Sequence, residues 1–241
     1  MVSRIARGIY RKTHPFWPFL QEDALAINAA RLDHLATLDL PVAGKSVLEV
    51  GAGIGLLTPF FIQRGCRVVS TDSRAGNVAE IKRRHPALEA EVVDLDHPET
   101  VKRVGPFDIV FCYGTLYHLA KPDEALAALA EISQLILLET VVNTADDESV
   151  QLVEESTTIN QAAHMVGARP SRQWVLNRLR SYWGHGYISR TQPAHPDFPV
   201  DWKQPPTGRL TRAIFVGSRA PISNRLLAEE IPSVHEMPAG V

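Results

Sequence analysis

The stretch VLEVGAGIG, residues 47–55, decides the fold. Residues 46–50 form a short, mostly apolar run that predicts a buried strand, and glycines follow it at positions 51, 53 and 55. Glycine lets the backbone pass close to a ligand, and in an open α/β sheet ligands bind at the carboxyl ends of the strands. The stretch therefore predicts a ligand site directly after the first strand of such a sheet.

Segments typical of strands and helices alternate on both sides of this stretch. Apolar residues recur at three- and four-residue steps over residues 22–38, which predicts an amphipathic helix ahead of the sheet. After the glycine turn, strands are predicted at 66–71, 90–93, 107–112 and 135–140, and helices at 56–64, 77–84 and 122–132. This alternation predicts a parallel sheet with helices on both faces, joined by right-handed crossovers.

The second half of the chain departs from that alternation. Residues 141–168 are polar and mostly patternless, and a helix is predicted at 171–179. Two further strand-like runs, 186–191 and 211–218, flank a segment rich in proline, histidine and aromatic residues, and we expect them to form a terminal hairpin. The tail after Pro221 is expected to wrap the surface or to be partly disordered.

The composition is that of a globular domain. The 241 residues carry 25 basic and 27 acidic side chains, for a net charge of −2. This charge argues against a protein that binds nucleic acid along its whole length. Cys66 and Cys112 belong to no metal-binding pattern, so no metal site is predicted and a reducing cytoplasm is expected. No apolar stretch approaches the roughly 18 residues of a membrane span. We therefore expect a soluble, cytoplasmic protein without a membrane segment.

The first 21 residues contain no acidic side chain. The segment holds four basic residues followed by three aromatic ones: Arg4, Arg7, Arg11, Lys12, Phe16, Trp17 and Phe19. Two interpretations stay open. The arm contacts an anionic partner, or its aromatic side chains pack over the domain while its charges stay solvated.

Two features narrow down the ligand of the glycine turn. The dinucleotide fingerprint GxGxxG would need a glycine where this chain has Leu56, so that motif fails by one residue. Glu49, two residues before the first glycine, would oppose a pyrophosphate, whereas it can attract the ammonium group of a ligand that carries an amino acid. A dinucleotide is therefore disfavoured.

Acidic residues at the ends of the next two strands indicate the remaining parts of the ligand. Asp72 lies 21 residues after Gly51, near the distance at which a strand-end acid bonds a ribose diol. Asp94 and Leu95 follow the next strand, where a carboxylate and a backbone N–H suit the edge of adenine. Ammonium, ribose and adenine together indicate S-adenosylmethionine.

At this point the sequence resembles the class I S-adenosylmethionine-dependent methyltransferases. The resemblance covers about residues 45–140, through LEVGAGIG at 48–55, STDS at 70–73, VVDLD at 92–96 and FDIVFCYGTLYHL at 107–119. It implies a Rossmann-like seven-stranded sheet whose last strand is antiparallel. Together with the patterns above, we expect helices on both faces of this sheet and an N-terminal helical extension. The runs at 186–191 and 211–218 fit its sixth and seventh strands.

The resemblance also implies a cofactor, S-adenosylmethionine, and the residues that bind it. Glu49, Gly51 and Gly53 would line the methionine end. The remaining predicted contacts are those of the ribose, the adenine and the edge of strand four: Asp72, Ser73, Asp94, Leu95 and Tyr113. We expect one methyltransferase domain over 1–241, with an N-terminal arm and helix at 1–43, a cofactor-binding half at 44–140, a substrate-side half at 141–219 and a tail at 220–241.

Methyl transfer from a sulfonium depends mainly on a well-placed acceptor, because the leaving group is excellent. A hydroxyl acceptor also benefits from a general base, and His118 is the best placed of the nine histidines, since it follows the end of the fourth strand. His118 is either this base, or it packs on the cofactor or caps the helix that begins at Pro122. His164 and His185 are weaker candidates for the base.

Acceptor specificity is expected in the parts of the chain outside the sheet. Glu139, Asn143 and Trp174 are the candidate acceptor contacts, although Glu139 equally suits a role in organising loop backbone. The predicted acceptor is a small molecule or carbohydrate modified at oxygen, and nucleic acid is not expected as a partner. Two alternatives stay open: an RNA-modifying methyltransferase that uses the basic arm, and a non-catalytic subunit that binds S-adenosylmethionine.

Overall fold

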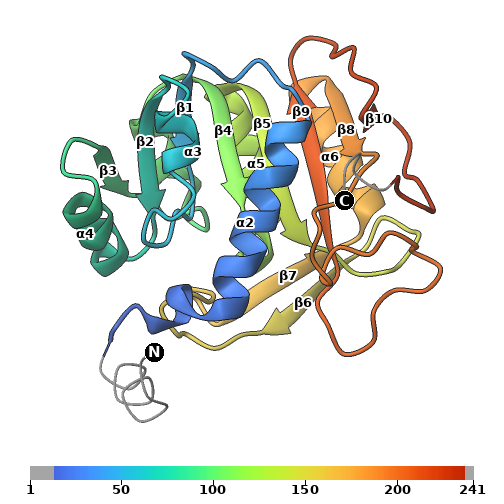
Figure 1. The fold of residues 1–241 in the computed structure, drawn as a ribbon, viewed down its shortest axis with the longest axis horizontal. Helices are drawn as coiled ribbons and strands as arrows, with labels where there is room; N and C mark the ends of the chain where they lie inside the picture. The colour runs from blue at the N-terminus through green and yellow to red at the C-terminus, as the bar shows by residue number, and fades with distance from the viewer. Residues whose placement is uncertain (1–13, 237–241) are drawn as a thin grey trace.

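The computed structural model describes residues 14–236, and an eight-stranded sheet forms its centre (Figure 1). The strands of this sheet are β1 (Ser46–Glu49), β2 (Arg67–Asp72), β3 (Glu89–Val92), β4 (Phe107–Tyr113), β5 (Ser133–Val141), β8 (His185–Ser189), β9 (Arg212–Ser218) and β10 (Leu227–Ala228). Their order across the sheet is β10-β8-β9-β5-β4-β1-β2-β3.

The first five strands pair in parallel, as the alternation of strands and helices predicts. β9 runs antiparallel to both of its neighbours, β5 and β8. The predicted fold class, a Rossmann-like sheet with an antiparallel last main strand, is therefore confirmed.

Helices cover both faces of the sheet. They are α2 (Glu22–Thr37), α3 (Pro59–Ile62), α4 (Ala75–Arg84), α5 (Pro122–Glu131) and α6 (Arg172–Trp183), with short 3₁₀ helices η1 (Trp17–Leu20), η2 (Pro98–Arg103) and η3 (Leu116–His118). α2 and α3 bury apolar side chains in one core, α5 and α6 in a second core on the opposite face. Figure 1 shows α2, the predicted N-terminal helix, crossing in front of the sheet. No helix within residues 14–236 is both long and apolar enough to cross a membrane.

Local sequence signals explain where several helices begin and end. Pro122 occupies the first turn of α5, where its missing N–H costs nothing, and two acidic residues follow it near the positive end of the helix dipole. Ser171 caps α6 by accepting a hydrogen bond from the backbone N–H of Trp174 at 3.0 Å. Gly184 caps the end of α6 with a φ of +92°, so the helix ends at Trp183, four residues beyond the predicted end.

Two features correct the predictions for the second half of the chain. Residues 141–168 contain regular structure despite their lack of a sequence pattern, because β6 (Val150–Glu154) and β7 (Val166–Pro170) form a separate antiparallel hairpin. Most β6 side chains are exposed or only partly buried, so no alternation of apolar and polar residues marks the strand. The tail also adds β10 at the edge of the sheet, which gives eight strands instead of seven.

The hairpin lies below the carboxyl ends of the central strands in Figure 1, near the N-terminal segment that leads into α2. Parallel strands place all their carboxyl ends at one edge of a sheet. The glycine turn, the acidic strand ends and the hairpin therefore meet on one face of the molecule.

Candidate functional site

The glycine turn after β1 requires glycine at its key positions. Gly51 and Gly53 have φ values of +62° and +57°, in the left-handed region that favours glycine. A Cβ on Gly51 would clash with the side chain of Thr115, and one on Gly53 would lie 2.6 Å from Cε1 of Phe19. The turn thus has neighbours on both sides that leave no room for a side chain.

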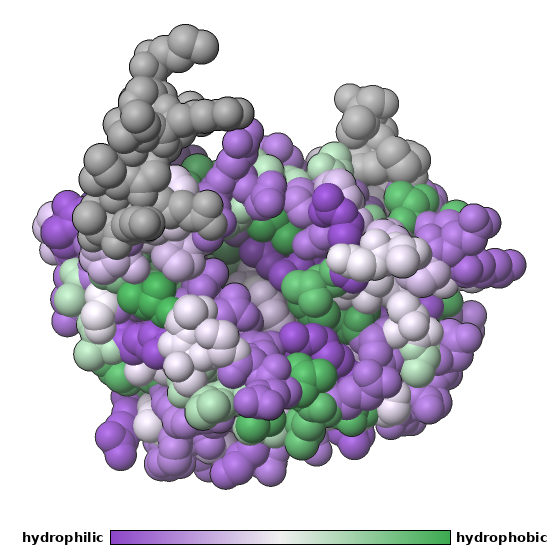
Figure 2. Space-filling view, turned by 90° about the horizontal axis from the view of Figure 1, so that it is seen from below, coloured by the Kyte–Doolittle hydropathy of each residue, from purple (hydrophilic) through white to green (hydrophobic). Residues whose placement is uncertain are grey.

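Two adjoining cavities open at this turn. The smaller, about 100 Å³, brings together most of the predicted cofactor contacts: Gly51, Gly53, Asp72, Ser73, Asp94 and Leu95. The larger, about 370 Å³, extends from the turn towards α2 and β9. Both are lined by Gly114 and His118. Figure 2, seen from below, shows that this face of the molecule is hollowed.

Asp72, at the end of β2, holds the glycine turn and the start of α4. Its Oδ2 accepts a hydrogen bond from the backbone N–H of Gly53 at 3.0 Å, and Oδ1 accepts from the N–H of Arg74 and from Nδ2 of Asn77. Burial raises the pKa of Asp72, against the lowering effect of these donors. A carboxylate has about four acceptor positions, so Oδ2 can still accept from a hydroxyl in the cavity.

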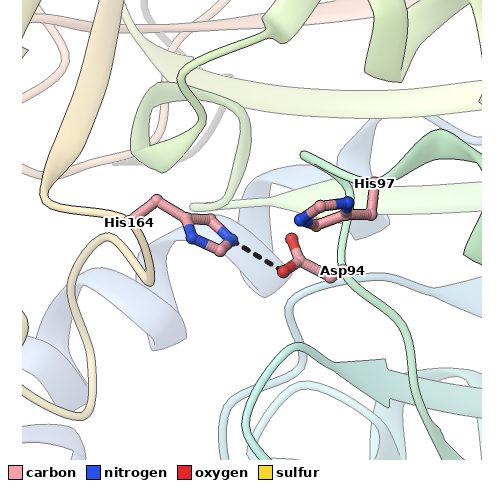
Figure 3. Close-up of side chains that lie close together, drawn as sticks. All are labelled: Asp94, His97 and His164. Carbon is pink, nitrogen blue, oxygen red and sulfur yellow. Dashed lines mark hydrogen bonds and ion pairs between the residues drawn. The ribbon is translucent and has the colours of Figure 1, made fainter.

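Asp94 contacts a residue that lies far away in the sequence. Its Oδ2 is 2.7 Å from Nε2 of His164 (Figure 3). Oδ1 accepts from the backbone N–H of Asp96 at 3.1 Å. His97 lies beside this pair, and the three side chains offer metal-ligating atoms within 4.8 Å of one another. Asp94, His97 and His164 could therefore hold a divalent metal, a cluster that the sequence spacing did not reveal.

His118, the last residue of η3, forms a close pair with a residue of the hairpin connection. Its Nδ1 lies 2.5 Å from Oε2 of Glu155, whose Oε1 accepts from Nη2 of Arg169 at 2.7 Å. Burial lowers the pKa of His118, and the hydrogen bond and charge of Glu155 oppose that effect. Sequence reasoning missed Glu155 because it lies in the segment that shows no pattern.

A buried ion cluster lies behind the larger cavity. Glu139 is fully buried, with Oε2 2.6 Å from Nη2 of Arg31 and Oε1 3.0 Å from Nη1 of Arg212. Both arginines line the cavity, whereas Glu139 does not. The guanidinium of Arg31 packs over Gly114, where an added Cβ would lie 3.0 Å from Nη2. Neither arginine has a local sequence signal, because each meets Glu139 only through the fold.

Tyr113, at the end of β4, lines the larger cavity. Its side chain is buried, and its hydroxyl has no hydrogen-bond partner among residues 14–236. Burial raises the pKa of this hydroxyl, so it stays protonated at physiological pH and is available as a donor.

The structure does not bring four of the predicted site residues to either cavity: Glu139, described above, and Glu49, Asn143 and Trp174. Glu49 points beneath the turn, where its Oε2 accepts from Oγ1 of Thr58 and Oγ of Ser70. Asn143 binds backbone at the start of the hairpin, through Nδ2 to the carbonyl of Arg169 at 2.8 Å. Trp174 is buried in the core between α6 and the sheet, because it lies on the apolar face of that helix.

The structure describes the N-terminal arm from residue 14 onwards. The basic residues Arg4, Arg7, Arg11 and Lys12 lie outside the described residues. Of the aromatic cluster, Phe19 lines both cavities and packs against Gly53, while Phe16 and Trp17 are partly buried. The aromatic part of the arm thus packs over the domain.

Comparisons with known proteins converge on the cofactor-binding half. Residues 47–136 match a family model described as a methyltransferase domain. A ubiquinone biosynthesis O-methyltransferase of Sodalis glossinidius is 33% identical over 111 residues, 44% of each chain. A ribosomal RNA small subunit methyltransferase A of Anaeromyxobacter dehalogenans is 40% identical over 92 residues, 36% of this chain and 30% of that one. The chain spans less than half the length of these relatives.

The similarity of fold extends over most of the chain. The N-terminal domain of EvdMO1, solved with SAH and D-fucose, has a TM-score of 0.63 and 21% identity, and the match covers 90% of this chain and 97% of that one. The match to EvdMO1 concerns the fold alone. The family model covers strands whose carboxyl ends, with the turns that follow them, line the cavities. Residues 47–136 therefore form a methyltransferase domain, and the chain has a Rossmann-like fold that it shares with a solved protein that binds SAH.

Proposed function

We propose that the protein transfers the methyl group of S-adenosylmethionine to an oxygen of a small molecule or carbohydrate, with His118 as the general base. The observation that carries this proposal is the position of His118, which lines both cavities at their junction. Nδ1 is hydrogen-bonded to Oε2 of Glu155, and Nε2 makes no hydrogen bond within the described part of the chain. A proton acceptor is thus available where the two cavities meet.

The smaller cavity suits the adenosine part of the cofactor. Asp72 and Ser73 supply polar groups for the ribose, and Asp94 and Leu95 line the side proposed for adenine. The glycine turn allows close approach of the methionine part, and Arg31 offers a guanidinium beside it for the carboxylate. We assign Glu49 a supporting role beneath the turn, through Thr58 and Ser70.

When bound, the cofactor would supply a methyl group on a sulfonium, and its transfer to an acceptor oxygen would leave the electron pair of the broken C–S bond on sulfur. Nε2 of His118 would take the proton of the acceptor hydroxyl. The main task of the protein is to hold the acceptor hydroxyl in line with that methyl group. Because burial lowers the pKa of His118, the imidazole is uncharged at neutral pH and can take a proton.

The larger cavity supports a small acceptor. Its volume of about 370 Å³ lies within the roughly 300–1,000 Å³ common for small-molecule sites. Ile27 and Leu57 provide apolar surface, while Tyr113 and Arg212 provide donors. The resemblance to a ubiquinone biosynthesis O-methyltransferase supports oxygen as the acceptor atom, although the matches also include ribosomal RNA methyltransferases.

The test is a His118→Ala variant assayed for formation of S-adenosylhomocysteine over a panel of phenols, hydroxy acids and sugars. A general base contributes about 10²- to 10⁴-fold, so we expect turnover to fall at least 10²-fold while calorimetric affinity for S-adenosylmethionine changes little. His185→Ala is the matched control, because His185 lines neither cavity.

Two outcomes would contradict the proposal. Lost cofactor affinity with preserved turnover per bound cofactor would mean that His118 packs on the cofactor instead of acting as a base. Turnover on transcribed RNA, with none on the small-molecule panel and a steep loss of binding with salt, would favour an RNA-modifying enzyme.

A further inference from the structure

We propose that Glu155 is the positioning residue of His118, and that it does this as part of a lid, residues 155–165, so that closing the lid over the cofactor also assembles the base. The inference deepens the proposed function and rests on it. The lid is the connection between β6 and β7.

The contact between Glu155 and His118 determines which ring nitrogen is free. A carboxylate only accepts hydrogen bonds, so Oε2 of Glu155, 2.5 Å away, holds the proton on Nδ1. Nε2 is then the unprotonated nitrogen, as a general base at the cavity junction requires. Glu155 is 5% exposed at its side chain, so water competes little for this contact.

Neighbouring residues keep Glu155 ionised and in place. Burial by itself would raise its pKa, but the hydrogen bonds and charges of His118 and Arg169 outweigh that effect and lower the pKa to about 2. Gly167 on β7 leaves the space that the carboxylate needs, because a Cβ there would lie 2.5 Å from Oε1 of Glu155. The backbone N–H of Glu155 also extends the hairpin ladder to the carbonyl of Met165 at 2.8 Å.

The rest of the lid covers the smaller cavity and is anchored on its ribose side. Ile159, Asn160 and Gln161 line that cavity. Nη2 of Arg74 lies within 3.1–3.4 Å of four lid carbonyls, and Nδ2 of Asn77 donates to the carbonyl of Ile159 at 3.3 Å. Arg74 and Asn77 also donate to Asp72, so the lid and the predicted ribose contact share the same partners.

The lid is anchored on the adenine side as well. His164 contacts Asp94 at 2.7 Å, as Figure 3 shows. Between the two anchors, the backbone N–H of Ala162 donates at 3.3 Å to Oε2 of Glu155, the same oxygen that holds His118. The segment that closes the cavity is therefore hydrogen-bonded directly to the carboxylate that orients the base.

Lid residues form one wall of the smaller cavity. Its volume of about 100 Å³ is below the roughly 300 Å³ at which ligand pockets usually begin. In the proposed cycle the lid shifts to admit the adenosine part of the cofactor, and any shift of the lid disturbs the contacts of Glu155. Closure after binding restores those contacts and, with them, the orientation of His118.

The first test measures the tautomer of His118 directly, by nitrogen-15 NMR of the imidazole in the full chain saturated with S-adenosylhomocysteine. We expect Nδ1 protonated and Nε2 unprotonated in the wild type, and a loss of this preference in Glu155→Gln, whose amide can also donate to Nδ1. Glu154→Gln is the matched control, because Glu154 is the exposed neighbour of Glu155. An unchanged tautomer in Glu155→Gln would overturn the positioning role.

Kinetics on an accepted substrate supply a second readout. We expect Glu155→Gln to lower kcat at least 10-fold, with affinity for S-adenosylhomocysteine within about 3-fold of wild type, which also shows that the variant folds. The acid limb of the kcat/KM profile should move to lower pH, because Glu155 raises the pKa of His118. A merely structural role would leave that limb in place.

The Arg74→Ala variant tests the coupling to the lid. Removing the ribose-side anchor should weaken binding of S-adenosylhomocysteine at least 5-fold and also reduce the share of His118 protonated at Nδ1. Weaker binding with an unchanged tautomer would overturn the coupling. If instead the tautomer responds as expected but His118→Ala retains full turnover, the positioning of the ring stands and the proposed function fails.

Discussion

Glu49→Gln tests what the acidic residue of the glycine-turn motif does. In the structure, Oε2 of Glu49 accepts hydrogen bonds from Thr58 at 2.5 Å and Ser70 at 2.7 Å, and the side chain is 2% exposed. Burial raises the pKa of Glu49 from its ordinary value of 4.5 to about 7, although the two hydroxyls lower it in part. Because both hydroxyls donate to the same oxygen, the amide oxygen of glutamine can replace it.

The sign and size of the effect follow from proton linkage. The unfolded chain loses the Glu49 proton near pH 4.5, whereas the folded protein keeps it up to about pH 7, so the free energy of unfolding falls as pH rises between these values. Each pH unit of that window is worth about 1.4 kcal/mol, and about 2–3 kcal/mol is lost between pH 5 and pH 8. Glutamine does not titrate, so the free energy of unfolding of the variant does not fall in this way as the pH rises.

Urea unfolding of wild type and Glu49→Gln at pH 5 and pH 8 measures the difference. We expect the variant to gain about 2–3 kcal/mol relative to wild type on going from pH 5 to pH 8. Glu91→Gln, a change at an exposed carboxylate, is the control for loss of a negative charge. Parallel pH dependence in wild type and Glu49→Gln would refute the reasoning, since Glu49 would then ionise freely in the folded state.

Two further substitutions test the walls of the cavities. Asp72→Ala should weaken binding of S-adenosylhomocysteine by about 1–3 kcal/mol in calorimetry, the usual worth of a charged hydrogen bond, and unchanged affinity would exclude Asp72 from the ribose site. Gly114→Ala places a Cβ 3.0 Å from Nη2 of Arg31 at a residue with φ of +74°, so we expect the urea midpoint to fall by the equivalent of roughly 1–2 kcal/mol. An unaltered midpoint would show that Arg31 moves aside at no cost.

Local sequence patterns were enough to predict the cofactor-binding half of the fold. Strand and helix signals there are local, and the end of each parallel strand maps to a known edge of the sheet. That is why Gly51, Asp72 and Asp94, spread over 44 positions, could be predicted to meet, and the structure places all three on the smaller cavity. The hairpin of β6 and β7 escaped detection because its exposed strand carries no apolar alternation.

Only the tertiary structure decided which side chains complete the site. Glu155 reaches His118 across 37 positions, and Arg31 reaches Glu139 across 108, through contacts for which no local pattern exists. The direction of a strand-end side chain is also a tertiary matter, since Glu49 turns to the hydroxyls beneath the turn while Asp72 lines the cavity. Residue type and spacing are local properties, but burial and orientation depend on what the distant parts of the chain pack against them.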